Sequence, residues 1–340
     1  MTPPRLTIAC GLVLCLLAAP SFGQSAGAVD ETAARAARAQ ALAAKAASGA
    51  ALTDAEIREL LEALPGERVD VPLVMLPVVV VDRRGRPIED LRERDFTVLE
   101  DGRPVELTWF RRDASADLRL LLLIDASGSM RPPAAVERLR RALLPLMRRI
   151  HRKDRLRLVS FARHGDVRVH GPWTSRAMLT LRRVLEIPRG GRTAIADALV
   201  EAAGMLPRAP VDRQAIVLVS DGVDNASRES FAAVIDAARA VETPVYVIAV
   251  GGQGRRIAAE RTPDGPLAAL RAIARETGGR FFVASDPAAA AEAARRIEDD
   301  LRHQYWLAFR PSRPPDGRFR RLEVRLARPG LTARTRSGYR

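Results

Sequence analysis

The sequence predicts an α/β protein whose doubly wound, mostly parallel sheet is flanked by a small β-sandwich. Two long apolar runs, Leu118–Ile124 and Ala215–Ser220, are typical of strands that are buried on both faces of a parallel sheet. Between Leu118 and His303, strand and helix patterns alternate, as a doubly wound sheet requires. Shorter strands of alternating polarity stand at both ends, in 71–113 and 304–340.

The first 23 residues are predicted to be a secretory signal peptide. A charged start precedes the apolar run Leu6–Ala19, and the small residues of Ser21–Gly23 fit the cleavage positions. The run is short for a transmembrane helix, which needs about 20 residues. Both cysteines, Cys10 and Cys15, lie in this segment, so the mature chain carries no disulfide. We therefore expect an exported protein, periplasmic or secreted, with no transmembrane span.

Residues 24–70 are predicted to form an alanine-rich helical linker. Arginines interrupt the alanines without a strong apolar stripe, and Thr53–Glu56 is a capping box that begins a short helix. We attach no function to this segment beyond that of a surface helix or spacer.

The segments 71–113 and 304–340 are predicted to pack together as the β-sandwich. The first contains the strand pattern Val74–Val81 and a hairpin that turns at Asp101–Gly102. The second contains alternating runs at Gln304–Arg310 and Arg320–Leu326. Three short strands bury too little surface alone, so each segment needs the other.

The segment 117–303 is predicted to be the main α/β domain. Its helices and strands follow in this order after the first strand: helix 133–151, strands 155–161 and 167–173, helices 175–186 and 194–206, strand 215–220, helix 230–241, strands 244–251 and 279–285, and a last helix from 287.

Oxygen-bearing side chains follow two of the buried strands and fill one glycine-rich loop. Asp125, Ser127 and Ser129 come directly after the first strand, Thr193 follows Gly190 and Gly191 in the chain, and Asp221 ends the strand 215–220. Ligands of open α/β sheets bind beyond the carboxyl ends of the strands. Carboxylate and hydroxyl oxygens suit a hard cation such as Mg²⁺. By itself the first loop is equally compatible with a turn that caps the next helix.

The order and spacing of these three motifs resemble the von Willebrand factor type A domain and its metal-ion-dependent adhesion site. The resemblance implies that Ser127, Ser129 and Thr193 contact the metal through hydroxyls, whereas Asp125 and Asp221 hold it largely through water. It also implies Mg²⁺ or Mn²⁺ as the cofactor. Asp224 and Asn225 follow Asp221 and either support the metal loop from outside or form a simple turn.

The flanks add a second resemblance. The run Val80–Pro87, the run Asp95–Pro104 and the closing Arg336–Tyr339 are similar to the bacterial VWFA-related family of exported proteins that was first recognised in acidobacteria. This resemblance covers the chain from about Val74 to its end. It implies architecture and export and names no common ligand.

The predicted site favours binding over catalysis. Two carboxylates balance a divalent cation, and the hydroxyls add no charge, so the cation keeps a position open to an outside oxygen. We expect that oxygen to be an acidic group of a protein partner. The sequence predicts no His–Asp pair that would make Ser127 a nucleophile, and it indicates no general base for a metal-dependent hydrolase. The four histidines lack the spacing of a zinc site. We therefore expect no enzyme.

A second hypothesis rests on charge alone. The net charge of +14 is carried almost wholly by arginine and could bind anionic envelope polymers or lipids without metal. Its most basic stretch, Arg138–Lys153, lacks the interleaved aromatic residues that single-stranded nucleic acid would need, so we expect no specific nucleic-acid binding. Because arginines are scattered through every predicted element, we favour the simpler explanation, a solvated surface of biased composition.

Overall fold

The computed structural model divides the chain into two compact units, Met1–Val71 and Pro72–Arg340. It describes residues 38, 41–42, 44–45, 73–112, 117–206, 213–221, 224–240, 243–250, 267–314 and 316–339. The predicted signal peptide and the capping box at Thr53–Glu56 lie outside these residues, and the described residues of the predicted linker are helical. A search of the described part of the chain finds no helix with the length and apolarity needed to cross a membrane.

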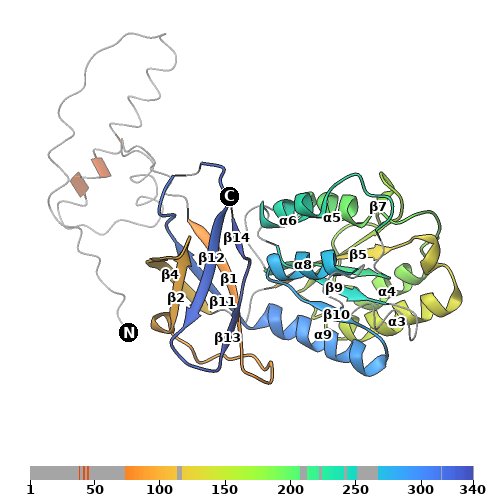
Figure 1. Cartoon of the computed structure of the whole chain (residues 1–340), viewed down its shortest axis with the longest axis horizontal. Helices are drawn as coiled ribbons and strands as arrows, with labels where there is room; N and C mark the ends of the chain where they lie inside the picture. The colour runs from red at the N-terminus through yellow and green to blue at the C-terminus, as the bar shows by residue number, and fades with distance from the viewer. Residues whose placement is uncertain are drawn as a thin grey trace, which may run out of the picture. The chain divides into compact units, whose positions relative to one another are not determined.

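A six-stranded sheet forms the centre of the main domain (Figure 1). Its strand order is β10-β9-β8-β5-β6-β7, and all neighbours are parallel except β6 and β7. The predicted doubly wound fold is thereby confirmed. The strands are β5 (Leu118–Asp125), β6 (Arg155–Phe161), β7 (Val167–Val169), β8 (Arg213–Ser220), β9 (Val245–Ala249) and β10 (Phe281–Val283).

Helices cover both faces of this sheet because alternate residues of the central strands point to opposite sides. Leu120 and Leu122 pack in one core with helices α3, α4 and α9, whereas Leu121 and Leu123 pack in the other with α5, α6 and α8. The helices are α3 (Pro133–Met147), α4 (Ala177–Glu186), α5 (Ile195–Gly204), α6 (Phe231–Ala240), α8 (Ala268–Glu276) and α9 (Pro287–Arg302), with short 3₁₀ turns at η2 (Glu93–Asp95) and η3 (Gly128–Met130).

Eight strands from the two ends of Pro72–Arg340 form the flanking β-sandwich. One sheet has the order β13-β1-β11-β4 and the other β14-β12-β2-β3, and a shared apolar core that includes Leu76, Val98 and Leu307 lies between them. The predicted sandwich is confirmed. Its strands are β1 (Val74–Val81), β2 (Phe96–Glu100), β3 (Arg103–Val105), β4 (Leu107–Arg112), β11 (Gln304–Phe309), β12 (Arg320–Leu326), β13 (Thr332–Arg334) and β14 (Gly338–Tyr339).

Three local expectations differ from the structure. The hairpin does turn at Asp101–Gly102, where both residues have positive φ, but its second strand ends at Val105 and β4 continues in the other sheet. The strand expected at 167–173 ends at Val169, because Gly171 adopts a φ of 102° that breaks the extended backbone. Helix α8 was not expected.

Candidate functional site

Asp125 occupies the carboxyl end of the central strand β5 and is fully buried. Its Oδ1 accepts a hydrogen bond from the Ser127 backbone N–H at 2.8 Å, and its Oδ2 accepts one from the Ser220 hydroxyl at 2.6 Å. Burial raises the pKa of Asp125 above its ordinary value; these hydrogen bonds act in the opposite direction, and the charge of Asp221 adds to the increase. A cation placed here would relieve both the burial penalty and the repulsion.

Ser127 and Ser129 lie beside each other on the loop that follows β5. Their Oγ atoms are 3.0 Å apart, with Ser127 buried and Ser129 exposed. The short η3 turn, which begins directly after Ser127 and contains Ser129, brings the two hydroxyls together. Two hydroxyl oxygens at this separation can contact one hard cation together.

Thr193 is buried in the loop that leads into α5. Two backbone hydrogen bonds join this loop to the first one: Gly128 N–H donates to Gly191 O at 3.0 Å, and Gly190 N–H donates to Ala126 O at 2.8 Å. A side chain on Gly128 would place a Cβ 3.3 Å from Gly191 O, so glycine permits this close approach.

Asp221 and Asn225 belong to the third loop, which follows β8. The Asn225 Oδ1 accepts from the Thr193 N–H at 2.9 Å, and the Asn225 N–H donates to Thr193 O at the same distance. Asp221 is half-buried, and its negative charge raises the pKa of Asp125, so the two carboxylates interact electrostatically. The three loops that carry the predicted ligands are therefore pinned together at one edge of the sheet.

Asp224 caps helix α5. Its Oδ2 accepts from the Ala196 N–H at 2.9 Å and from the Ser227 hydroxyl at 2.7 Å. The predicted pair of supporting residues thus does two different things, since Asn225 holds the backbone of Thr193 and Asp224 holds the first turn of the helix behind it. Whether either residue supports a metal stays a prediction.

Sequence reasoning missed three groups near this edge. Ser220 donates to Asp125 from the neighbouring strand, and the pairing of β5 with β8 is what brings it there. The Arg189 guanidinium is near enough to feel the charge of Asp125, and it donates to the carbonyls of Val184 and Ile187 at the end of α4. His170 forms a 2.7 Å hydrogen bond with Ser160. Only Ser220, a hydroxyl in an otherwise apolar strand, left a signal in the sequence.

The donor set fits a hard cation. It combines two carboxylates with three hydroxyls, which is oxygen chemistry of the kind that Mg²⁺ and Mn²⁺ accept. In the described part of the chain, no three His, Cys, Asp or Glu side chains gather as a metal site would need. A metal at this edge would need serine and threonine oxygens beside the two carboxylates.

Comparisons with known proteins match the part of the chain that carries the predicted ligands. Residues 120–223 match the family model of the von Willebrand factor type A domain. An uncharacterized protein of Mycobacterium tuberculosis is 30% identical over 108 residues, which cover 30% of this chain and 17% of that protein.

Two solved structures are similar at low identity. An aerotolerance-related membrane protein from Bacteroides fragilis is 20% identical with a TM-score of 0.42, covering 54% of this chain and 98% of its own. A von Willebrand factor type A protein from Catenulispora acidiphila is 14% identical with a TM-score of 0.43, covering 79% of this chain and 73% of its own.

Proposed function

Because the chain contains a von Willebrand factor type A domain, we propose that it is a protein-interaction module that grips an acidic group of its partner through Mg²⁺ or Mn²⁺. The domain supports an interaction or adhesion role in general. The metal and the acidic group are the specific parts of the proposal, and they rest on the residues at the edge of the sheet.

One observation carries the proposal: hydrogen bonds fix the three predicted ligand loops to one another. Gly128 and Gly190 join the first loop to the second, and Asn225 joins the third to the second. Such loops hold their oxygens in place before a ligand arrives, so binding costs little ordering entropy.

Each of the predicted residues has its own role in the proposed metal site. Ser127, Ser129 and Thr193 would hold the cation through uncharged oxygens, and Asp125 and Asp221 would neutralise it. A bound divalent cation would supply one coordination position to an outside oxygen, and a carboxylate would fill it best. Ser220 keeps the buried Asp125 carboxylate oriented by donating to its Oδ2.

We propose binding without catalysis. The Ser127 side chain hydrogen-bonds to Ser129 at 3.0 Å and also to the Asp125 carboxylate, and we propose that these contacts hold its hydroxyl as a ligand oxygen. The fully buried Asp125 carboxylate accepts from the Ser127 N–H and the Ser220 hydroxyl, so we propose that it holds the loop and a cation and does not take a proton from a substrate. We also propose that the protein acts outside the cytoplasm, in the periplasm or beyond it, because residues 1–23 have the pattern of a signal peptide.

The alternative of a metal-independent polyanion binder gains less support. Within the basic helix α3, Arg140 and Arg141 both bind Glu137 at 2.7 Å, and on α9 Arg295 and Arg296 both bind Glu292. One glutamate in each group offsets part of the charge of its two arginines, which weakens the field that a polyanion would sense. The two functions differ in their salt response, because polyanion binding weakens steeply as ionic strength rises.

The experiment is a relaxation titration with Mn²⁺ as the probe. Protein-bound Mn²⁺ that keeps exchangeable water speeds the relaxation of water protons, and a peptide carboxylate that displaces this water reduces the effect. The peptide acetyl-Gly-Gly-Asp-Gly-Gly-amide should reduce it, whereas acetyl-Gly-Gly-Asn-Gly-Gly-amide, which has no carboxylate, should not. Equal responses to both peptides, or binding of the aspartate peptide that persists in excess chelator, would contradict the proposal.

A further inference from the structure

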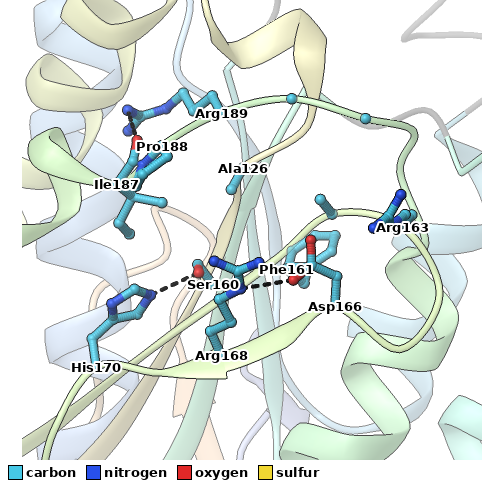
Figure 2. A pocket seen from close by; sticks show the side chains of 13 residues that line it. Ala126, Ser160, Phe161, Arg163, Asp166, Arg168, His170, Ile187, Pro188 and Arg189 are labelled. Atoms are coloured by element: carbon cyan, nitrogen blue, oxygen red, sulfur yellow. Dashed lines mark hydrogen bonds and ion pairs between the residues drawn. The ribbon is translucent and has the colours of Figure 1, made fainter.

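A cavity of about 320 Å³ opens beside the candidate metal site, on the side of β6 and β7 (Figure 2). Ala126, the residue after Asp125, forms part of its wall, and Gly190 and Gly191 of the second ligand loop form another part. Ser160 and His170 also line it, and Figure 2 shows their side chains pointing toward each other. The cavity and the metal site therefore share two loops.

The charged side chains that line this cavity are mostly cationic. They are Arg163, Arg168 and Arg189, with Asp166 as the acidic member. The Arg168 Nε donates to Asp166 at 2.7 Å, and no residue that the structure describes accepts a hydrogen bond from its two terminal nitrogens. Arg163 forms no ion pair within the described part of the chain. Two guanidinium groups thus retain donors for a ligand.

Neutral donors and acceptors complete the wall. The Ser160 hydroxyl and the His170 Nε2 are 2.7 Å apart. Burial lowers the pKa of His170 below its ordinary value, and the charges of Arg168 and Arg183 lower it further, which favours the neutral imidazole. A neutral imidazole adds no positive charge, but it sits where the charge of a bound anion would change its environment.

We propose that this cavity binds a second carboxylate of the same acidic partner, next to the one that the metal site holds. This inference rests on the proposed function. The partner segment then carries two neighbouring acidic side chains. The first lies at the edge formed by Asp125 and Thr193, and the second forms a paired, charge-assisted hydrogen bond with the open fork of Arg168.

The position of the cavity favours this assignment over an unrelated anion site. The chain passes directly from Asp125 to Ala126, and Gly191 stands two positions before Thr193. A peptide that placed one carboxylate on the metal would cover these residues, and its neighbouring side chain would reach the cavity. Because an arginine fork and a carboxylate match in geometry, Arg168 also favours the paired acidic partner over one with a single acidic group.

His170 provides the readout. The chain has four histidines, so a protein labelled with ¹³C at the histidine rings gives few signals, and His170→Gln identifies the one that matters. We would titrate dicarboxylates from succinate to suberate in excess chelator at constant ionic strength. The His170 signal should shift saturably, while the signals of His151, His164 and His303 should not.

Two variants decide the role of Arg168. Arg168→Gln should abolish the shift. Arg325→Gln is its matched control, because Arg325 also binds an acidic side chain two residues before it through its Nε at 2.7 Å, with 63% of the side chain exposed against 68% for Arg168. A shift that survives in Arg168→Gln, disappears equally in Arg325→Gln, or is absent in the wild-type protein would overturn the proposal.

A second step separates the cavity from the metal site. With Mg²⁺ in place of chelator, the best-fitting dicarboxylate should shift the His170 signal at a concentration at least about 10-fold lower, because two linked groups bind two sites. Butyrate cannot bind both sites at once, so the concentration at which it shifts the His170 signal should not change. If the shift in chelator depends on Arg168 but Mg²⁺ changes nothing, the cavity binds anions and the link to a metal-held partner is overturned. If Mg²⁺ tightens butyrate instead while Arg168→Gln has no effect, the metal site stands and the second pocket fails.

Discussion

Removing the Ser220 hydroxyl tests how the site is built. In wild-type protein this hydroxyl donates to the Oδ2 of Asp125 at 2.6 Å, and the carboxylate is fully buried. Ser220→Ala leaves that oxygen with one donor fewer in a place that water does not reach. A hydrogen bond to a charged group contributes about 1.5–3 kcal/mol, so we expect a loss of that size in the free energy of unfolding.

The assay is urea denaturation in excess chelator, with Ser285→Ala as the matched control. Ser285 also donates to an aspartate, Asp286, at 3.0 Å, but that pair is exposed and should contribute nothing measurable. Ser220→Ala should also weaken Mg²⁺ binding, because Asp125 loses the donor that keeps it charged and oriented. If Ser220→Ala unfolds at the same urea concentration as wild-type protein, or if both variants lose equally, the burial argument is wrong.

Three further predictions concern the hydrogen bond between Asn225 and Thr193, the apolar core at Leu122 and the helix cap at Asp286. Asn225→Ala leaves the buried N–H of Thr193 without its acceptor, so it should lower the free energy of unfolding in chelator by about 1–3 kcal/mol and weaken Mg²⁺ binding. An unchanged Mg²⁺ affinity would show that Asn225 does not position the ligand loop. Leu122→Ala in the fully buried centre of β5 should cost about 2–5 kcal/mol by urea denaturation, and a cost well below that range would contradict the packing. Asp286 accepts from the Ala289 N–H, which holds its pKa below the ordinary value of 3.8, so its contribution to stability is present above that pH and is lost as the pH falls through the folded-state pKa. Asp286→Ala should therefore lower the free energy of unfolding at pH 7, and this loss relative to wild-type protein should shrink in acid. Asp286→Asn keeps the cap without the titrating group, so the contribution of its cap should depend little on pH. A loss in Asp286→Ala that is constant with pH would refute this.

The fold was predictable because its strongest signals are long and local. The apolar runs that became β5 and β8 are longer than any turn could tolerate, and only a strand buried on both faces explains them. The sandwich was predictable because the alternating patterns at both ends needed partners. Helix α8 was missed because it spans only Ala268–Glu276, although Leu270, Ile273 and Ala274 form its buried stripe.

The candidate site was predictable only in part. The order of Asp125, Thr193 and Asp221 along the chain indicated three converging loops, and the structure shows these loops joined by hydrogen bonds. Their role as metal ligands stays a prediction. The donor from Ser220 and the basic cavity around Arg168 depend on strand pairing and loop closure between distant segments, which no local pattern encodes.

The structure also changes which variant is most informative. Asp125 holds the Ser127 backbone and the Ser220 hydroxyl in the buried centre of the site, so its removal would perturb folding as well as any metal. Ser129 is exposed, and the hydrogen bond that the structure describes for its hydroxyl is to Ser127. Ser129→Ala therefore removes a predicted ligand and leaves the fold intact.

The most direct test of the metal-dependent site is a thermal unfolding titration with Mg²⁺ and Mn²⁺ on wild-type protein, Ser129→Ala and the matched control Ser285→Ala. A cation that binds only the folded state raises the unfolding midpoint by mass action. We predict a rise for wild-type protein and Ser285→Ala, a much smaller one for Ser129→Ala, and equal midpoints for all three in chelator. Midpoints that do not respond to millimolar metal, or that rise equally in all three proteins, would contradict the account.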